Sequence, residues 1–359
     1  MKFDLAFFRG KNVLVTGHTG FKGTWLCKVL CENEANVVGY SLIPNTKPSL
    51  YEMISLDEQM ISIEGDIRNL SHLEKVFREY RPEIVIHLAA QPIVRESYKE
   101  PVYTYETNVM GTVNILECIR KTGTVKSFLN VTTDKVYLNR EWEWGYRENE
   151  ELNGYDPYSN SKSCSELVTS AYNNSFLQEQ GIAVSTARAG NVIGGGDFAK
   201  DRIIPDCVRA VRENRIIEIR NPNSVRPYQH VLEPIFAYLM IAALQYQNIK
   251  YAGNYNIGPD ETDCWSTGKL VEQFVKTWGE NLKWKKTLDE GPHEANYLKL
   301  DCSKIKQIFN WKPTWTLEEA VDMIVEWNKE WLNKSNIEKC MERQIQKYIN
   351  ECEWYGQEV

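Results

Sequence analysis

NVLVTGHTGFKGTWL, residues 12–26, contains the clearest structural signal in the chain. The aliphatic run at its start predicts a buried strand, and the segment 23–33 has the pattern of a helix. Between them, Gly17, Gly20 and Gly23 allow a tight turn whose backbone N–H groups can approach a pyrophosphate at the helix N-terminus. This glycine spacing alone is weak evidence, but the strand before it and the helix after it strengthen it. The segment therefore predicts a dinucleotide-binding turn.

The first half of the chain alternates short apolar runs with helical patterns. Strands are expected at residues 12–17, 35–40, 61–66, 83–90, 127–133 and 183–192, and helices at 23–33, 73–80 and 107–120. Such alternation predicts an α/β protein with a Rossmann-like, doubly wound parallel sheet. Ligands of these sheets bind beyond the carboxyl ends of the strands.

After about residue 190 the pattern loosens into loops, with helical patterns at 203–213, 231–246 and 267–278. We expect a dinucleotide-binding domain over residues 1–190, with a return segment at 231–258. Residues 191–230 and 259–359 are expected to form a smaller, mostly helical substrate-binding lobe. Two amphipathic helices, roughly 317–332 and 337–353, end the chain. The apolar face of the second either packs on its own domain or forms a subunit contact.

Composition excludes several classes of protein. Hydrophobic residues make up 42% and charged residues 25% of the chain, as in ordinary globular proteins, and the net charge of −7 argues against a nucleic-acid partner. There is no apolar run long enough for a membrane helix and no cleavable signal pattern at the N-terminus. The nine cysteines include no C-x-x-C pair, which is typical of a reducing compartment, so we expect a cytoplasmic protein. Cys27 and Cys31 are interpreted as small core residues rather than metal ligands, and no metal site is predicted.

Further cofactor contacts are expected where other strands end. Asp66 can accept a hydrogen bond from an adenine amino group, or it is an ordinary turn residue. His87 lies in an apolar strand and is interpreted as a core histidine rather than a catalyst or metal ligand. The predicted cofactor-binding residues are Gly17, Gly20, Phe21, Gly23, Asp66, Ile67, Leu88, Ala89, Ala90, Tyr158 and Lys162.

The end of the second strand lacks the acidic residue that usually binds the 2′-hydroxyl of NAD. Tyr40 and Ser41 occupy that place, and no arginine stands there to favour a 2′-phosphate. NAD therefore remains the preferred cofactor.

Tyr158 and Lys162 lie four residues apart on a predicted helix and project from one face. A lysine ammonium near a phenol is expected to lower the pKa of the phenol, which suits Tyr158 to general-base catalysis. On its own this spacing is usually a solvated helix face. Downstream of a dinucleotide turn, with Thr133 at a strand end between them, it indicates oxidation of an alcohol.

With these motifs the chain resembles the extended short-chain dehydrogenase/reductase family and, within it, the nucleotide-sugar 4,6-dehydratases. The resemblance covers nearly the whole chain and is strongest to the branch that acts on CDP-glucose. It rests on VTGHTGFKGTWL (15–26), AAQPIVRESY (89–98), TTDKVY (132–137), REWEWGYREN (140–149), NGYDPYSNSK (153–162), RAGNVIGGGDFAKDRIIPD (188–206), RPYQHVLEP (226–234) and HEANYLKLDCSK (293–304).

The resemblance implies a lyase that oxidises C4 of a hexose with NAD, eliminates water across C5 and C6, and returns the hydride to C6. It implies that Thr133 holds O4, Asp134 protonates the leaving hydroxyl and Lys135 is the C5 base. Related dehydratases carry Asp-Glu where this chain has Asp134-Lys135, and a lysine must be neutral to act as a base. A solvated turn pair is the alternative interpretation of these two residues.

The resemblance also implies substrate contacts at Asn191, Arg202, Arg226 and His230. For Arg202 and His230 the alternatives are a structural salt bridge and a buried loop histidine. A GDP-mannose-type dehydratase or a 4-epimerase is the alternative function, and a non-catalytic dinucleotide sensor is the alternative class. A homo-oligomer, either dimer or tetramer, and a role in deoxysugar synthesis for lipopolysaccharide O-antigen are expected.

Overall fold

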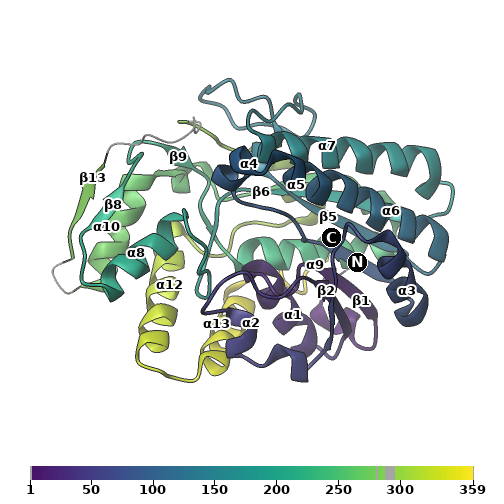
Figure 1. Ribbon diagram of the computed structural model, residues 1–359, viewed down its shortest axis with the longest axis horizontal. Helices are drawn as coiled ribbons and strands as arrows, with labels where there is room; N and C mark the ends of the chain where they lie inside the picture. The colour runs from purple at the N-terminus through teal and green to yellow at the C-terminus, as the bar shows by residue number, and fades with distance from the viewer. Residues whose placement is uncertain (1, 280–281, 288–295, 359) are drawn as a thin grey trace.

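A seven-stranded parallel sheet forms the centre of the computed structural model, which describes residues 2–279, 282–287 and 296–358 (Figure 1). The strand order is β11-β6-β5-β4-β1-β2-β3, and every pair of neighbours is parallel. The strands are β1 (Asn12–Thr16), β2 (Asn36–Ser41), β3 (Ile61–Glu64), β4 (Ile84–His87), β5 (Ser127–Thr133), β6 (Ala183–Ala189) and β11 (Asn254–Ile257). This order confirms the predicted doubly wound sheet, with the reversal of direction between β1 and β4.

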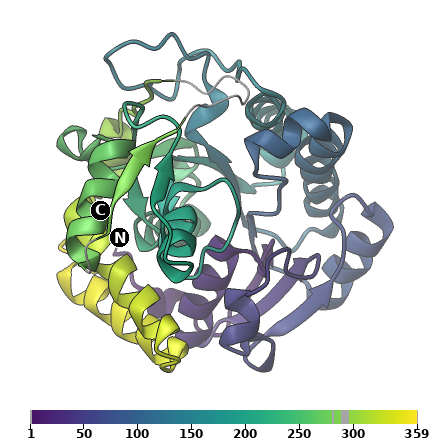
Figure 2. The ribbon, with the colours of Figure 1, turned by 60° about the vertical axis from the view of Figure 1, so that its left-hand side comes forward.

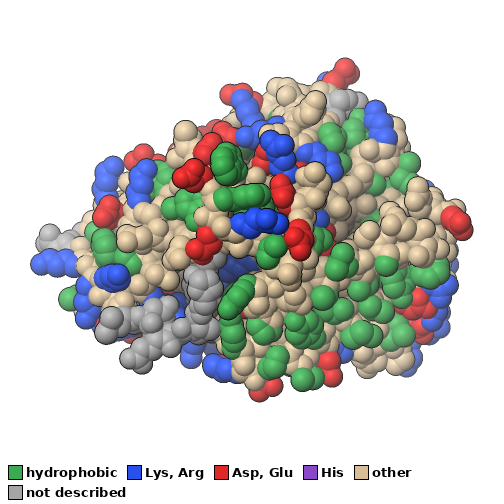
Figure 3. Space-filling view, turned by 90° about the horizontal axis from the view of Figure 1, so that it is seen from above, with side chains coloured by type: hydrophobic (Ala, Val, Ile, Leu, Met, Phe, Trp, Pro, Cys, Tyr) green, Lys and Arg blue, Asp and Glu red, His purple; other side chains and the backbone are tan. Residues whose placement is uncertain are grey.

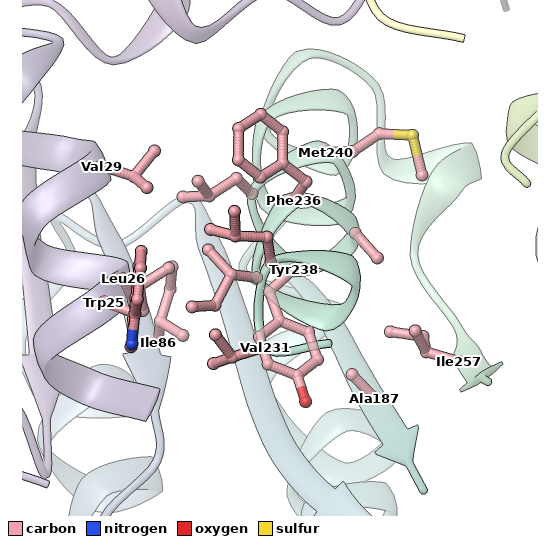
Figure 4. Close-up of a cluster of buried hydrophobic side chains, with 14 of the residues drawn as sticks. Trp25, Leu26, Val29, Ile86, Ala187, Val231, Phe236, Tyr238, Met240 and Ile257 are labelled. Carbon is pink, nitrogen blue, oxygen red and sulfur yellow. The ribbon is translucent and has the colours of Figure 1, made fainter. Parts of the chain in front are cut away.

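Two hydrophobic cores cover the two faces of this sheet. Val13 and Val15 of β1 belong to one core, whereas Leu14 between them belongs to the other, because successive side chains of a strand point to opposite faces. The first face is covered by α1 (Phe21–Glu32) and α9 (Leu232–Gln247), whose side chains meet above the sheet (Figure 4). The second face is covered by α3 (Leu70–Tyr80), α6 (Gly111–Thr122) and α7 (Pro157–Tyr172).

A smaller lobe projects from the carboxyl side of the sheet, on the left in Figure 1. It has its own apolar core, which includes Ile204, Phe274 and Val321. Its elements are α8 (Ile203–Arg212), β8 (Ile217–Ile219), α10 (Thr267–Trp278), β13 (Trp284–Lys286) and α12 (Leu317–Leu332). Segment 231–258 leaves this lobe and returns to the sheet as α9 and β11.

The C-terminal helix α13 (Ile337–Glu351) packs on the sheet domain. The Lys28 ammonium on α1 lies 2.6 Å from a carboxylate oxygen of Glu338, and the Tyr348 hydroxyl donates to buried Glu233 of α9 at 2.8 Å. The two termini meet beside this helix, where the backbones of Lys2 and Glu358 form an isolated antiparallel β-bridge (Figure 2). The apolar face of α13 therefore packs on its own subunit, and these contacts favour placing α13 with the sheet. The division into lobes remains a prediction.

Shorter elements connect the main ones. They are η1 (Leu5–Phe8), α2 (Leu50–Met53), η2 (Leu56–Glu58), α4 (Val94–Lys99), α5 (Pro101–Tyr105), η3 (Glu106–Met110), η4 (Asp134–Val136), η5 (Asn173–Leu177), β7 (Val192–Ile193), β9 (Val225–Arg226), β10 (Gln229–His230), η6 (Ile249–Tyr251), η7 (Glu261–Asp263), β12 (Trp265–Ser266) and α11 (Ser303–Phe309). The start of the 293–304 motif lies outside the described residues. Across the part of the chain that the structure describes, no helix has the length and apolar character needed to cross a membrane.

Candidate active site

A cleft of about 300 Å³ lies beyond the carboxyl ends of β5 and β6, against the smaller lobe. Its volume falls at the small end of the range for ligand sites. Of the predicted residues, it is lined by Phe21, Leu88, Ala90, Thr133, Asp134, Lys135, Tyr158, Lys162, Asn191, Arg202 and Arg226. The fold thus brings together most of the predicted site from segments that are far apart in the sequence.

The glycine-rich turn has the geometry of a dinucleotide cradle. Gly17 has φ +75°, and a Cβ there would lie 2.8 Å from the backbone nitrogen of Ala89. A Cβ on Gly23 would lie 2.1 Å from the carbonyl oxygen of Gly17. The first N–H groups of α1 face this turn without intrahelical partners, as at any helix N-terminus. Side chains here would push the turn away from the Ala89 backbone and α1 away from the turn, so the glycines keep the helix N-terminus close to the strand ends, as a dinucleotide site requires.

The turn after β3 holds Asp66 and Ile67. The Asp66 carboxylate binds Arg68 at 2.6 Å, and this arginine lowers the pKa of the carboxyl. The Tyr40 hydroxyl donates to the carbonyl oxygen of Asp66 at 3.0 Å, and this hydrogen bond helps to fix the turn. Ile67 is buried against Gly111. The part of Asp66 in adenine binding remains a prediction.

His87 at the end of β4 is a core histidine, as predicted. Its ring nitrogens lie 2.7 Å from the Thr16 hydroxyl and 3.2 Å from the Thr112 hydroxyl. Burial lowers the pKa of His87 to about 3, which keeps the ring neutral. The following residues Leu88 and Ala90 line the cleft.

Tyr158 and Lys162 lie in the first two turns of α7. Pro157 begins this helix and the Asp156 side chain caps it by accepting from the backbone N–H of Ser159. The Lys162 ammonium donates to the carbonyl oxygen of Val131 at 3.1 Å, which fixes the lysine beneath the end of β5. Burial lowers the pKa of Lys162 to about 8.

The pKa of Tyr158 is raised, not lowered as the sequence predicted. Burial raises the pKa of Tyr158 to about 12, opposed by hydrogen bonding with Thr133 and by the positive charge of Arg202. The loss of water around the phenol therefore outweighs the neighbouring cations.

The pair that follows β5 is a buried acid next to a half-buried lysine. Asp134 is 1% exposed, and one of its oxygens accepts from the Thr133 hydroxyl at 3.0 Å. The other carboxyl oxygen has no hydrogen-bond partner among the residues that the structure describes. Burial raises the pKa of Asp134 even though Lys135 opposes the rise. A surface turn pair is thereby excluded for Asp134, whose carboxyl favours the protonated form more than an exposed aspartate does.

On the side of the smaller lobe, Asn191, Arg202 and Arg226 line the cleft, whereas His230 does not. Arg202 forms an ion pair with Asp197 at 2.9 Å. His230 is 1% exposed and its ring packs between Trp25 and Trp315. The structure thus contradicts the prediction that His230 contacts substrate, because β10 directs this ring into the core.

Sequence reasoning missed several residues of the cleft, above all Lys22. Lys22 lies within the glycine-rich turn, and its side chain lines the same cleft as Asp134 and Tyr158. The signal in the sequence was a lysine between two glycines of the turn, in the string G-F-K-G (20–23). Other lining residues that were not predicted are Arg95, Ser224, Tyr228 and Thr267.

The chain belongs to the GDP-mannose 4,6 dehydratase family, whose sequence profile matches residues 14–324. Within that class it is 48% identical, over 97% of its length and 98% of the relative's, to the CDP-glucose 4,6-dehydratase of Salmonella typhimurium. It is 25% identical, over 88% of its length and 97% of the relative's, to a dTDP-glucose 4,6-dehydratase of Haemophilus influenzae.

Among solved structures, a dTDP-glucose 4,6-dehydratase of Bacillus anthracis in complex with NAD superposes with a TM-score of 0.75 at 22% identity, covering 92% of this chain and all of that one (100%). A UDP-glucose 4-epimerase of Thermotoga maritima gives 0.78 at 24% identity, covering 89% and 99%. These two structures support the fold.

Proposed function

We propose that the protein is an NAD-dependent lyase that converts CDP-D-glucose to CDP-4-keto-6-deoxy-D-glucose and water. The observation that carries this proposal is the buried Asp134 carboxyl, with one free oxygen, beside Thr133 and Tyr158 in one cleft. A 4-epimerase needs a residue that exchanges a proton with O4 but no acid for a leaving hydroxyl. The identity of 48% to the Salmonella enzyme supports the choice of CDP-glucose.

The first step is oxidation at C4. NAD held at the glycine-rich turn would supply the hydride acceptor for C4 and the hydride that C6 receives after elimination, when the Lys135 ammonium returns its proton to C5. Tyr158 takes the proton of the C4 hydroxyl, and Thr133 holds O4 by a hydrogen bond. Because burial disfavours the Tyr158 phenolate, the Thr133 hydroxyl and the Arg202 charge are needed to stabilise it.

The second step is elimination of water from the 4-keto sugar, whose C5 proton is acidic because the carbonyl is adjacent. Lys135 removes that proton as a neutral amine and becomes an ammonium. Asp134 gives its proton to O6 as the C6–O6 bond breaks, and water leaves. The raised pKa of Asp134 supports this role, because the carboxyl must be protonated to act as an acid.

On the other side of the cleft, Asn191 and Arg226 bind the substrate diphosphate. Arg226 suits this role because its planar guanidinium can bind phosphate oxygens through two N–H groups. Arg202 is held in place by Asp197 and adds positive charge near the same position.

A panel of CDP-, GDP-, UDP- and dTDP-glucose tests the proposal. Each nucleotide sugar is incubated with the full-length protein and NAD, and the 4-keto product is followed by its absorbance in base and by NMR. We expect turnover of CDP-glucose well above the others. Interconversion of glucose and galactose nucleotides without loss of water would indicate a 4-epimerase instead.

We also propose that the protein is a homo-oligomer that associates through α5 and α7. These helices contact one another, and Val102, Met110 and Leu167 in and beside them are 70%, 51% and 56% exposed. Apolar side chains are spread over the half of the surface that these helices occupy, on the right in Figure 3. Apolar area of this kind is favourable to bury against a second copy of the chain.

A cytoplasmic location and a role in lipopolysaccharide O-antigen synthesis complete the proposal. All nine cysteines are free thiols, which supports a reducing compartment. The 4-keto-6-deoxy sugar is an activated precursor for further deoxysugars.

A further inference from the structure

Lys22 is the one cleft lysine that belongs to the glycine-rich turn itself. It follows Phe21 at the start of α1, lies half-buried, and faces the cleft that Tyr158, Lys162 and Asp134 also line. Its ammonium lies 5.9 Å from the ring centre of Tyr238 on α9. Within the described part of the chain, Lys22 forms no ion pair with a carboxylate. Burial lowers the pKa of Lys22 to about 7, so below that pH its ammonium is available to a bound molecule.

Lys22 connects the two ends of the cofactor site. The glycine-rich turn that contains Lys22 would hold the pyrophosphate of the cofactor. Hydride transfer would take place beside Tyr158. The nicotinamide half of the cofactor must therefore extend from the first place to the second, along the part of the cleft that Lys22 faces.

We propose that the Lys22 charge makes the site bind the reduced cofactor in preference to the oxidised one, and so favours hydride removal from the substrate. The inference rests on the NAD assignment of the proposed function. The nicotinamide ring of NAD carries one positive charge and that of NADH carries none. A nearby ammonium repels the first and leaves the second unaffected, so it shifts the balance between them.

The surroundings of Lys22 show that positive charge is disfavoured there. Burial lowers the pKa of Lys22 to about 7, and the charges of Lys162 and Arg202 lower it further while Asp134 opposes them. The charge of Arg202 is partly offset by Asp197, whereas among the described residues the hydrogen-bond partner of Lys162 is a backbone carbonyl alone. The field that disfavours a proton on Lys22 also disfavours a cationic ring beside it.

The alternative role for Lys22 is a contact with the pyrophosphate. Affinities for three ligands distinguish this role from a charge beside the nicotinamide. The pyrophosphate is common to NAD, NADH and ADP-ribose, whereas only NAD has the cationic ring. A phosphate contact would change all three affinities alike, but a charge beside the nicotinamide changes their ratio.

The test measures dissociation constants of NAD, NADH and ADP-ribose by calorimetry for the full-length protein freed of nucleotide, at a pH below the Lys22 pKa of about 7, where this amine is charged. Lys22→Met removes the charge at nearly constant length, Lys22→Gln is a second neutral variant should the first fail to fold, and Lys22→Arg retains the charge. We expect the ratio of the NAD to the NADH dissociation constant to fall about tenfold in the neutral variants, and to stay near the wild-type value in Lys22→Arg. ADP-ribose affinity is expected to stay unchanged.

An unchanged ratio, or an equal loss of affinity for all three ligands, would overturn the inference and leave the proposed function standing. A wild-type protein that binds neither dinucleotide would refute the proposed cofactor itself. Because the readout is binding, a loss of turnover in the variants does not enter the result.

Discussion

At the scale of single residues, the Tyr158 phenol lies in the cleft beside Asp134 and Lys162, and burial raises its pKa to about 12. The spacing of Tyr158 and Lys162 correctly placed both side chains in one cleft, because residues four apart share a helix face. The direction of the tyrosine pKa shift was wrong, because the pKa depends on how much water the fold removes from the phenol. Burial of this kind arises from chain segments distant in sequence and is not visible in the helix alone.

Replacing Tyr158 with phenylalanine is expected to abolish oxidation at C4 and to leave CDP-glucose affinity near the wild-type value. The phenol oxygen is the group proposed to take the O4 proton, and its removal deletes no apolar contact. Stopped-flow absorbance should show no transient NADH. Turnover should fall by ~10²–10⁴-fold, the usual contribution of a general base. A variant with a normal NADH transient would contradict the assignment.

Lys135→Ala and Asp134→Asn are expected to spare hydride transfer and to stall elimination, so that 4-keto-hexose and NADH accumulate on the enzyme. Lys135→Ala should also stop exchange of the C5 hydrogen with deuterated solvent, since no other group is proposed to remove it. Losses of about 10²–10⁴-fold are typical for general acid–base groups. Near wild-type dehydration with unchanged C5 exchange in Lys135→Ala would show that another residue is the base.

At the scale of elements, six of the seven sheet strands and most of the long helices were predicted, because their apolar residues repeat with a clear period, whereas β11 was expected only as part of a return segment. The helices α4 and α5 were not predicted, because exposed apolar residues such as Val102 break the amphipathic pattern there. His230 was misplaced for a related reason. The family resemblance implied a substrate contact for His230, but its ring packs against Trp25 and Trp315, which are far away in the sequence.

Two glycine substitutions distinguish the loss of the cofactor site from the backbone strain that any side chain causes at a positive φ. Gly17→Ala is expected to weaken NAD binding at least about tenfold, because Cβ would clash with the Ala89 backbone and α1 would shift. Gly123→Ala is the matched control, since Gly123 has φ +69° and open space around its Cβ position. The control is expected to cost only about 1–2 kcal/mol of stability. Equal NAD affinity in the Gly17 variant and the wild type, measured by calorimetry, would exclude the turn from the cofactor site.

At the scale of the whole molecule, the sheet domain and the smaller lobe enclose the cleft between them. Most of the predicted site residues lie in this cleft, because their motifs are at strand ends, which gather at one edge of a parallel sheet. Lys22 and Arg95 were not predicted, because their place in the cleft beside the catalytic groups depends on chain segments that are distant in the sequence.

The exposed face of α5 and α7 predicts the behaviour of the assembled protein. Val102→Glu combined with Leu167→Glu is expected to shift the oligomer to a monomer, since two charges would be buried without partners. Sedimentation velocity measures the change. Ile249→Glu is the control, because Ile249 is 48% exposed but lies in η6, away from these helices. An unchanged sedimentation coefficient in the double variant would place the interface elsewhere.

The most direct test of the proposed reaction follows the hydrogen that starts on C4 of the sugar. CDP-glucose that carries deuterium at C4 is incubated with the full-length protein, and the product is analysed by NMR. The proposed reaction predicts a 4-keto-6-deoxy product with deuterium in its C6 methyl group, since the hydride removed from C4 returns to C6. A product without deuterium at C6, or deuterium accumulating in NADH in amounts that match the substrate consumed, would contradict it.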